Sequence, residues 1–349
     1  MKKILLINNG YPSEKNKHYV SYIKSIKECL IASNFDVDLL VMSSAFSSLT
    51  GKIKCYLSYY YNLLTFKNYE GYDYVYINNF PHSFLPLVVH FNKINKVIIH
   101  WHGDDIESVG QFKRVFNKIS YAFVPKKALH FSPSNYFAYN VSEKLGVDKE
   151  AIIVSPSGGV DVGVFKPLNS VKERHDIIVK IGFSSHLSAE KGLDLIIELL
   201  NNARNLQFNR KVVLEFHYIK YGADKERYSK VLKSIENTVE HSMMKKEDMP
   251  IFYNAIDVFV FPTKRESLGS VGLEAMSCGV PVLGTNDFAI KEYVIPGING
   301  ELFEKDDYQS FEDNLIICVN NLENYNPRET ILKEYSKEAV VNKYKQILG

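Results

Sequence analysis

Two glutamates enclose a run of small residues in the segment ESLGSVGLE, residues 266–274. The preceding DVFVFPT is expected to form a strand, and the next helix is expected to begin within SVGLE, with Ser270 as its N-cap. Glu266 would then lie in the strand-to-helix loop, and Glu274 in or just after the first helical turn. Glycines in such a loop let a ligand approach the N–H groups of the helix start, which favour an anion. The two carboxylates would accept hydrogen bonds from hydroxyl groups, and the N–H groups would hold a phosphate. A sugar nucleotide is a ligand that has both groups.

A simpler role for these glutamates must be weighed as well. A glutamate near a helix start often only interacts with the helix dipole or completes a capping box. With Ser270 as the N-cap, the box position is Leu273 and not Glu274. The nine residues alone leave both roles open.

The elements that would position this segment alternate along the chain. Short β-branched runs alternate with segments of helical periodicity, which indicates βαβ units and parallel sheets covered on both faces. The expected fold class is therefore α/β, with two Rossmann-like domains facing one another across a cleft. The glycine-rich residues 157–170 interrupt the pattern, so we expect domains at 1–165 and 166–332 and a C-terminal helix over 333–349 that packs back on the first. The expected strands are 3–7, 36–42, 73–77, 96–100 and 128–132, then 176–181, 211–216, 257–261 and 280–283.

Charge and cysteine content narrow the class of function. Residues 1–165 carry 18 Lys and Arg against 13 Asp and Glu, whereas the remainder carries 24 against 27. A basic first half suits an acidic partner or an anionic membrane surface, but the excess is too small to indicate nucleic acid. The four cysteines have neither zinc nor disulfide spacing, and no run of 18 apolar residues occurs. A cytoplasmic protein is expected.

The wider surroundings of the two glutamates resemble a known family. The segment FYNAIDVFVFPTKRESLGSVGLEAMSCGVPVLGTN, followed by EYVIPGINGELF, resembles retaining glycosyltransferases of the GT-B type, notably glycosyltransferase family 4. In that family the first glutamate of a Glu–seven residues–Glu signature contacts the donor sugar, and the second contacts the ribose hydroxyls of the nucleotide. The resemblance implies these roles for Glu266 and Glu274. It also implies that the backbone between them lines the sugar and the diphosphate, at Leu268, Gly269, Ser270 and Val271.

A second segment, HLSAEKGLDLII over residues 186–197, resembles the part of the family that holds the donor diphosphate. Lys191 matches the diphosphate-binding lysine, where a cation would neutralise charge that develops on the leaving nucleotide. The arginine of the family is replaced by His186, and a neutral imidazole offers one donor where guanidinium offers a charged fork. Lys264 and Arg265, just before Glu266, are candidates to compensate. Without the resemblance, Lys191 would be interpreted as an exposed lysine before a helix.

The segment IIHWHGDDIES, residues 98–108, resembles the His-Gly-x-Asp segment of the family. The resemblance implies that His102 approaches the donor sugar or the acceptor as a catalytic residue, and that Asp105 belongs to the acceptor and phosphate loop. His100 is expected to be a strand residue that supports His102.

The first strand-to-helix loop, within residues 7–23, resembles a glycine-bearing loop of the family near the acceptor and the diphosphate. Gly10 is retained there. Lys17 or His18 occupies the place of a later glycine, so a bulkier and more basic loop is expected.

Metal binding is the weaker interpretation of the acidic and histidine residues. The sequence Asp36-Val37-Asp38 fits a metal motif of the other large glycosyltransferase fold, but three residues match easily by chance. His100 and His102 point to one side of a strand, while Asp104 and Asp105 lie beyond a glycine turn. The resemblance implies that no metal and no other cofactor is required.

Residues 51–74 are rich in tyrosine and lysine. A helical face is predicted that joins Ile53, Tyr56, Leu57, Tyr60, Tyr61 and Leu64. One interpretation is a helix packed on the first domain. The other is a membrane-interface helix, with tyrosines at headgroup level and lysines over anionic lipid.

The resemblance implies a retaining glycosyltransferase that moves a sugar from a nucleoside-diphosphate sugar to an acceptor hydroxyl in bacterial surface polysaccharide or glycolipid assembly. A UDP-sugar donor is expected ahead of a GDP-sugar, with a glycan or lipid-linked glycan as acceptor and the inner face of the cell membrane as a place of action. Two alternatives remain. One is a GT-B-shaped epimerase or phosphorylase, and the other is a non-catalytic sugar-nucleotide-binding subunit, which the loss of the arginine at His186 favours.

Overall fold

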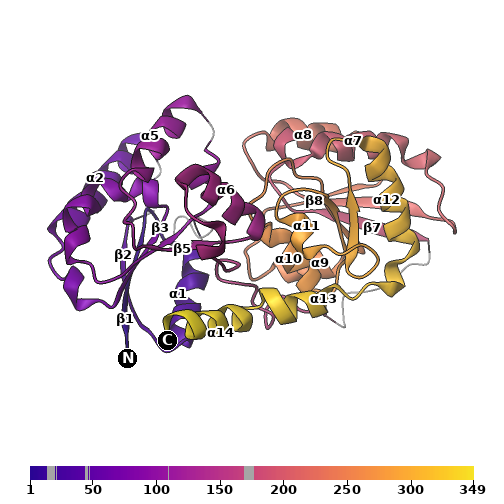
Figure 1. Ribbon diagram of the computed structural model, residues 1–349. Coiled ribbons are helices and arrows are strands. Elements are labelled where there is room, and N and C mark those ends of the chain that lie inside the picture. Colours follow the sequence, from indigo (N-terminus) through magenta and orange to yellow (C-terminus); the bar gives the residue numbers. More distant parts are fainter. Residues whose placement is uncertain (14–19, 21, 44–45, 47, 109, 169–176) are drawn as a thin grey trace. The chain divides into compact units, whose positions relative to one another are not determined.

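The computed structural model describes residues 1–349 except 14–19, 21, 44–45, 47, 109 and 169–176 (Figure 1). The chain divides into two compact units, of which the first comprises Met1–Gly159 and Lys337–Gly349 and the second Val160–Ser336. Val160 and Phe165 belong to the hydrophobic core of the second unit. The stretch 160–165 therefore packs with the second unit and not with the first.

The first unit is built around a parallel sheet with the strand order β2-β1-β3-β4-β5-β6. Ile4, Leu5, Leu6 and Ile7 of the inner strand β1 are all buried, as expected for a strand covered on both faces. The strands are β1 (Lys3–Asn8), β2 (Asp36–Val41), β3 (Tyr74–Asn78), β4 (Val97–His100), β5 (Leu129–Ser132) and β6 (Ile152–Val154). The α-helices are α1 (Tyr22–Ala32), α2 (Leu49–Thr65), α3 (Phe84–Leu87), α4 (Gly103–Ile106), α5 (Gln111–Tyr121), α6 (Asn135–Leu145) and α14 (Lys337–Leu348).

The second unit repeats the plan with the strand order β12-β11-β10-β7-β8-β9, again all parallel. Its strands are β7 (Ile178–Phe183), β8 (Val213–Ile219), β9 (Thr238–His241), β10 (Val258–Phe261), β11 (Val282–Thr285) and β12 (Gly300–Phe303). Its α-helices are α7 (Leu193–Asn202), α8 (Lys225–Leu232), α9 (Met249–Asn254), α10 (Ser270–Ser277), α11 (Ile290–Tyr293), α12 (Tyr308–Asn320) and α13 (Pro327–Thr330). The expected α/β class with two parallel-sheet domains is thus confirmed.

Local signals in the sequence set several helix ends. The Ser134 side chain accepts a hydrogen bond of 3.1 Å from the Phe137 N–H at the start of α6, and Gly146 ends that helix with a φ of 68°. Asp307 caps α12 in the same way through the Ser310 N–H, at 3.0 Å. These helices begin and end where their own residues satisfy the free backbone groups.

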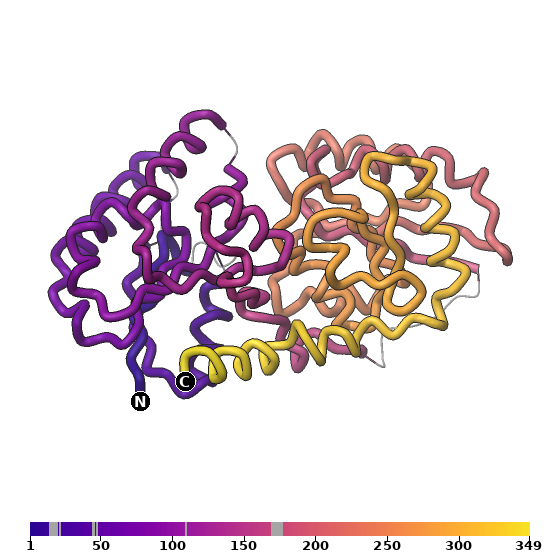
Figure 2. Tube along the Cα trace, viewed as in Figure 1, coloured from indigo at the N-terminus to yellow at the C-terminus, as the bar shows by residue number. Residues whose placement is uncertain are grey.

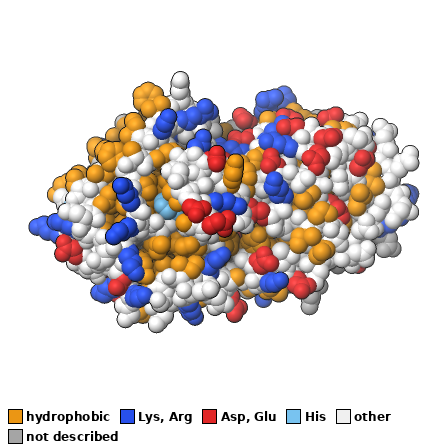
Figure 3. Space-filling view, in the orientation of Figure 1, with side chains coloured by type: hydrophobic (Ala, Val, Ile, Leu, Met, Phe, Trp, Pro, Cys, Tyr) orange, Lys and Arg blue, Asp and Glu red, His pale blue; other side chains and the backbone are white. Residues whose placement is uncertain are grey.

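Two helices of the first unit keep hydrophobic side chains at the surface. Leu57 of α2 is 65% exposed and Phe112 of α5 is 95% exposed. Figure 3 shows hydrophobic side chains gathered over these elements, with lysines and arginines beside them. No helix within the described residues combines the length and the apolar character that a transmembrane span needs.

The last helix, α14, completes the core of the first unit. It lies beside α1 (Figure 2), and its Val340, Tyr344 and Leu348 are buried with residues of β1, β3 and α1. The Tyr344 hydroxyl lies 3.1 Å from the Tyr76 hydroxyl, which in turn lies 2.9 Å from the His100 Nδ1. The helix was expected from residue 333, but it begins at Lys337, after a π-helical turn at Ile331–Tyr335 that packs with the second unit.

Replacing Tyr344 by alanine is expected to destabilise the first unit. A buried aromatic replaced by alanine costs about 3 to 5 kcal/mol, and Tyr76 would also lose a buried hydrogen-bond partner. Denaturant unfolding of Tyr344→Ala should show this loss, whereas the exposed Gln346→Ala on the same helix should match the wild type. Equal stability of the two variants would contradict the assignment of α14 to the core.

Candidate functional site

In the second unit, Lys191 and Glu266 meet beside the carboxyl end of β10. The Lys191 ammonium lies 3.0 Å from the Glu266 Oε2 and also donates to the Arg265 carbonyl at 3.1 Å and to the Thr263 hydroxyl at 3.3 Å. The two charged side chains keep only 22% and 21% of their surface exposed. Because 75 residues separate them in the chain, the fold and not the local sequence brings this cation and carboxylate together.

Glu274 lies deeper, on α10, and contacts a second lysine. Its Oε2 accepts a hydrogen bond of 3.3 Å from the Tyr253 hydroxyl, and its Oε1 lies 3.4 Å from the Lys246 ammonium. Burial raises the pKa of the Glu274 carboxyl, and the charge and hydrogen bond of Lys246 lower it in opposition. Each glutamate of the motif is therefore paired with a lysine from elsewhere in the same unit.

The loop between the glutamates turns on Gly269. Its φ of 84° is left-handed, and a Cβ at this position would lie 2.6 Å from the Tyr293 hydroxyl and 2.8 Å from a ring carbon of Phe261. Gly269, and not Ser270, is the N-cap of α10, so the expected cap was wrong by one residue. The helix does begin within SVGLE, and Glu274 follows its first turn as expected.

The other backbone residues expected to line the donor differ in exposure. Leu268 and Gly269 are buried, Val271 is half-buried and Ser270 is exposed. At the start of α10 the Gly272 N–H donates to the Gly269 carbonyl at 2.9 Å. The N–H groups before it, of Ser270 and Val271, are at the position where a helix start favours an anion.

Lys191 is held in place by a close backbone approach. The residue that follows it, Gly192, has a φ of 76°, and a Cβ there would lie 1.8 Å from the Pro262 carbonyl oxygen. Only glycine lets the short helical turn Ala189–Lys191 come this near to the residues after β10.

His186 lies in the same region but is not a cation. Burial lowers its pKa, and the charge of Lys191 lowers it further. Its ring packs edge-on against Tyr221, with 4.7 Å between the ring centroids. Burial also raises the pKa of Tyr221, and the charges of Glu266 and Glu274 raise it further. The Tyr221 hydroxyl donates to the Ser184 carbonyl at 3.0 Å.

Lys264 and Arg265, the candidates to replace the arginine of the family, are paired with other carboxylates. Lys264 lies 2.7 Å from Asp306, and Arg265 lies 3.6 Å from Glu190.

In the first unit, His102 follows β4 in a polar cluster. Its Nε2 lies 2.9 Å from the Asn78 Oδ1, and its ring packs against those of Tyr22 and His100, each with 4.4 Å between centroids. Burial and the neighbouring His100 hold the pKa of His102 well below its usual value, so the ring is neutral near pH 7. The buried Asn78 Nδ2 and His100 Nε2 have no hydrogen-bond partner among the described residues. Polar atoms left unpaired in this way are suited to meet a ligand.

Asp105 and Gly10 have mainly structural contacts. The Asp105 carboxylate accepts a hydrogen bond of 3.1 Å from the His102 N–H, and burial raises its pKa to about 8. The Gly10 carbonyl accepts one of 2.6 Å from the Asn8 side chain. Lys17 and His18 lie outside the described residues.

Asp36 and Asp38, which fit the metal motif in sequence, make other contacts. Asp38 accepts a hydrogen bond of 2.8 Å from the Tyr72 hydroxyl, and Asp36 lies 3.9 Å from Lys3. Among the described side chains, no group of three His, Cys, Asp or Glu residues is arranged to hold a metal ion.

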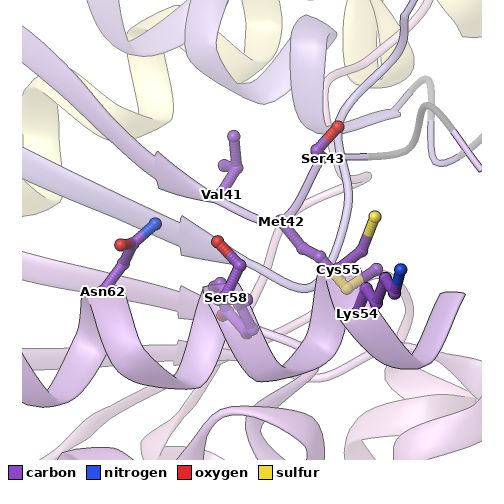
Figure 4. Close-up of a pocket in the computed structure, with 8 residues that line it drawn as sticks. Val41, Met42, Ser43, Lys54, Cys55, Ser58 and Asn62 are labelled. Carbon is purple, nitrogen blue, oxygen red and sulfur yellow. The ribbon is translucent and has the colours of Figure 1, made fainter. Parts of the chain in front are cut away.

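A hollow of about 280 Å³ lies between the end of β2 and α2 (Figure 4). Lys54, Ser58 and Asn62 of α2 border it, together with Val41 and Ser43. None of the site residues expected from the sequence lines it.

Several residues of these clusters were missed by sequence reasoning. Lys246 and Tyr253 contact Glu274, and Asn78 contacts His102. Asn78 ends β3, next to the strand that precedes His102, so the rule that ligands bind at the carboxyl ends of parallel strands could have found it. No local signal marks Lys246, which follows another lysine in a polar loop.

Comparison with known proteins identifies the second unit. A family model described as glycosyl transferases group 1 matches residues 171–339. This part of the chain is a glycosyl transferases group 1 domain. It contains Lys191, Lys246, Glu266 and Glu274, so both lysine–glutamate pairs lie within the matched residues.

Two curated relatives show where such domains occur. The chain is 28% identical over 181 residues to the capsular polysaccharide biosynthesis glycosyltransferase CapM of Staphylococcus aureus, covering 50% of this chain and 46% of CapM. It is 23% identical over 224 residues to an uncharacterized 41.2 kDa protein in the cps region of Klebsiella pneumoniae, covering 61% of this chain and 59% of that protein. The match thus spans about half the length of these relatives.

Solved structures resemble the whole chain and not only the group 1 domain. Sucrose-phosphate synthase from Thermosynechococcus elongatus has a TM-score of 0.76 at 16% identity and covers 100% of this chain and 98% of its own. HepE of Anabaena, in complex with UDP-glucose, has a TM-score of 0.71 at 16% identity, with coverages of 100% and 99%. The fold is therefore that of GT-B glycosyltransferases.

The close approach at Gly192 predicts a position-specific loss of stability. Gly192→Ala should destabilise the second unit by more than the roughly 1 to 3 kcal/mol of a left-handed non-glycine residue, because its Cβ would also collide with Pro262. Gly297 is a matched control with a φ of 75° and open space around a Cβ. Denaturant midpoints that are equal for Gly192→Ala and Gly297→Ala would refute the steric constraint.

Proposed function

We propose that the protein is a retaining glycosyltransferase that moves a sugar from a nucleoside-diphosphate sugar to an acceptor hydroxyl in the assembly of a surface polysaccharide or glycolipid. The observation that carries this proposal is the pairing of Lys191 with Glu266 at 3.0 Å. In a nucleotide sugar, the sugar is bonded directly to the distal phosphate. A cation that binds the phosphate and a carboxylate that binds the sugar, held close together, would therefore lie on the two sides of the sugar–phosphate bond that must break.

The roles assigned to the group 1 domain follow from charge. Lys191 and the first N–H groups of α10 hold the diphosphate, and Lys191 neutralises the charge that the leaving phosphate gains. Glu266 accepts hydrogen bonds from the transferred sugar, and Glu274 accepts them from the ribose. Since His186 is neutral, Lys191 is the cation that its own segment contributes. This assignment requires no metal ion and no other cofactor.

In the proposed reaction, the bond between the anomeric carbon and the phosphate oxygen breaks while the acceptor oxygen bonds to the same carbon from the same face. The acceptor proton passes to the departing phosphate oxygen, so the products are the glycoside and a nucleoside diphosphate. His102 is assigned to the sugar or the acceptor as a neutral hydrogen-bonding group, because the pKa of its imidazole lies well below 6.5.

The comparisons support a donor and a setting for this activity. HepE binds UDP-glucose, and CapM belongs to capsular polysaccharide biosynthesis. We infer a UDP-sugar donor, a glycan or lipid-linked glycan acceptor, and a cytoplasmic place of action. No disulfide bond joins the four cysteines, all of which lie in the described part of the chain, and this fits a reducing compartment.

Glutamine substitutions at the two glutamates should have different kinetic effects. Glu266→Gln weakens contacts to a sugar ring that gains positive charge in the transition state, so it should mainly lower kcat. Glu274→Gln weakens contacts to a ribose that does not change, so it should mainly raise KM and weaken nucleoside-diphosphate binding. A charge-assisted hydrogen bond is worth about 1.5 to 3 kcal/mol, so each effect should be roughly tenfold or larger.

Steady-state kinetics with the donor found by thermal-shift screening of UDP-, GDP- and ADP-sugars would measure both effects. The exposed Glu247→Gln in the same unit is the control and should behave as wild type. A wild-type kcat for Glu266→Gln, or normal nucleotide binding by Glu274→Gln, would remove the corresponding role. Wild-type behaviour of both variants would favour a non-catalytic sugar-nucleotide-binding subunit instead.

The pH dependence of nucleotide binding should report on Lys246. The ionised Glu274 is the stronger acceptor, so binding should weaken as the pH falls through its folded pKa, which burial raises above 4.5. Lys246 lowers that pKa, so Lys246→Ala should move the weakening to higher pH. Calorimetric titration with UDP over a pH series would show the shift. Lys245 is an exposed neighbour of equal charge, so Lys245→Ala should leave the pH dependence unchanged. Superimposable profiles for all three proteins would show that Lys246 does not act on Glu274.

A further inference from the structure

Helix α2 presents an unpartnered apolar face. Its exposed hydrophobic side chains are spaced three or four residues apart, so they share one side of the helix. They are Leu49, Ile53, Leu57, Tyr61 and Leu64, all at least half exposed. Tyr59 and Leu63 are fully buried on the other side, against the first sheet. The helical face predicted from the sequence is therefore divided, because Tyr56 and Tyr60 are only partly exposed and pack against the core.

Helix α5 presents a second such face. Phe112, Val115, Ile119 and, just beyond the helix end, Phe123 are exposed at 95%, 56%, 52% and 42%. Their spacing again places them on one side. The opposite side is anchored by the buried Asn117, whose side chain donates to the Asp104 and Asp105 carbonyls at 2.9 Å each.

The two helices flank one common element, the turn around His82. The His82 ring lies 6.3 Å from that of Tyr56 of α2 and 6.5 Å from that of Phe116 of α5. Helix α3 packs against α2 and adds the exposed Leu85, and Val89 follows it. We call the exposed faces of α2 and α5, with Leu85 and Val89, the apolar surface.

The charges around the apolar surface have one predominant sign. No aspartate or glutamate occurs between Asp38 and Glu70, or between Glu107 and Glu143. Lys52 and Lys54 lie on the two flanks of Ile53, and Lys118 lies beside Ile119, all three exposed. Asp104, an acidic residue that precedes α5, lies 2.7 Å from Lys113 and compensates its charge.

From this combination we infer that the apolar surface docks on an anionic lipid bilayer. Such a bilayer offers an apolar interior for leucine, isoleucine and phenylalanine and negative headgroups for the flanking lysines, with tyrosine at the boundary. A single monomer rarely leaves this many large apolar side chains exposed on adjacent elements, and a second copy of this chain would bring the same cations face to face. The inference does not depend on the proposed transferase activity.

Vesicle sedimentation of the full chain tests the inference. The protein should pellet at least tenfold more with phosphatidylcholine vesicles that contain phosphatidylglycerol than with phosphatidylcholine alone, and added salt should reduce the difference because it screens surface charge. Leu57→Glu and Phe112→Glu should each lower the anionic binding at least tenfold. Ile317→Glu, an exposed isoleucine on α12 of the second unit, should leave it unchanged.

Two further measurements distinguish membrane docking from misfolding of the variants and from self-association. Leu57→Glu, Phe112→Glu and Ile317→Glu should keep the wild-type unfolding midpoint, since the replaced side chains are exposed. Lys118→Glu should lower binding to the anionic vesicles and leave binding to the neutral vesicles unchanged. Equal pelleting of wild type and surface variants would overturn the inference. A dimer in light scattering that Leu57→Glu dissolves, with no vesicle binding by the wild type, would also overturn it and assign the surface to a second copy of the chain.

Discussion

The group 1 domain depends on a backbone approach that leaves no room for a side chain. Gly192 brings the turn that carries Lys191 against the Pro262 carbonyl, where a Cβ would be 1.8 Å away. Gly269 does the same for the loop that carries Glu266, against Tyr293 and Phe261. Gly192 and Gly269 both have left-handed backbones, which glycine adopts without strain. Each of them therefore helps to place the charged side chain in its own loop. The 3.0 Å contact between Lys191 and Glu266 is the result.

The electrostatics of the two glutamates differ because their depths differ. The Glu266 side chain is 21% exposed and lies 3.0 Å from its lysine, whereas the Glu274 side chain is 11% exposed and lies 3.4 Å from its lysine. Burial raises the pKa of Glu274, and the charge of Lys246 opposes this rise. Both carboxylates of the motif are thus paired with a lysine, and Glu274 also accepts a hydrogen bond from the Tyr253 hydroxyl.

Much of the fold was predictable because its inner strands are continuous apolar runs. The three strands that were missed, β6, β9 and β12, all lie at sheet edges. Edge strands need fewer apolar residues: β9 reads TVEH and β12 begins with glycine. The cap of α10 was misplaced for another reason, since the room around Gly269 is decided by Tyr293, 24 residues later. Lys246 and Asn78 escaped notice because their contacts to Glu274 and His102 cross between elements.

The position of α14 has a consequence for biosynthesis. The second unit is a continuous stretch, Val160–Ser336, whereas the core of the first unit includes Val340, Tyr344 and Leu348. A ribosome therefore makes the whole of the second unit before it supplies the last helix of the first. Domains usually fold in the order of their synthesis, from the N-terminus onward. Here residues 1–159 are synthesised first, but part of their core stays uncovered until α14 is made. The first unit is therefore the last to be completed.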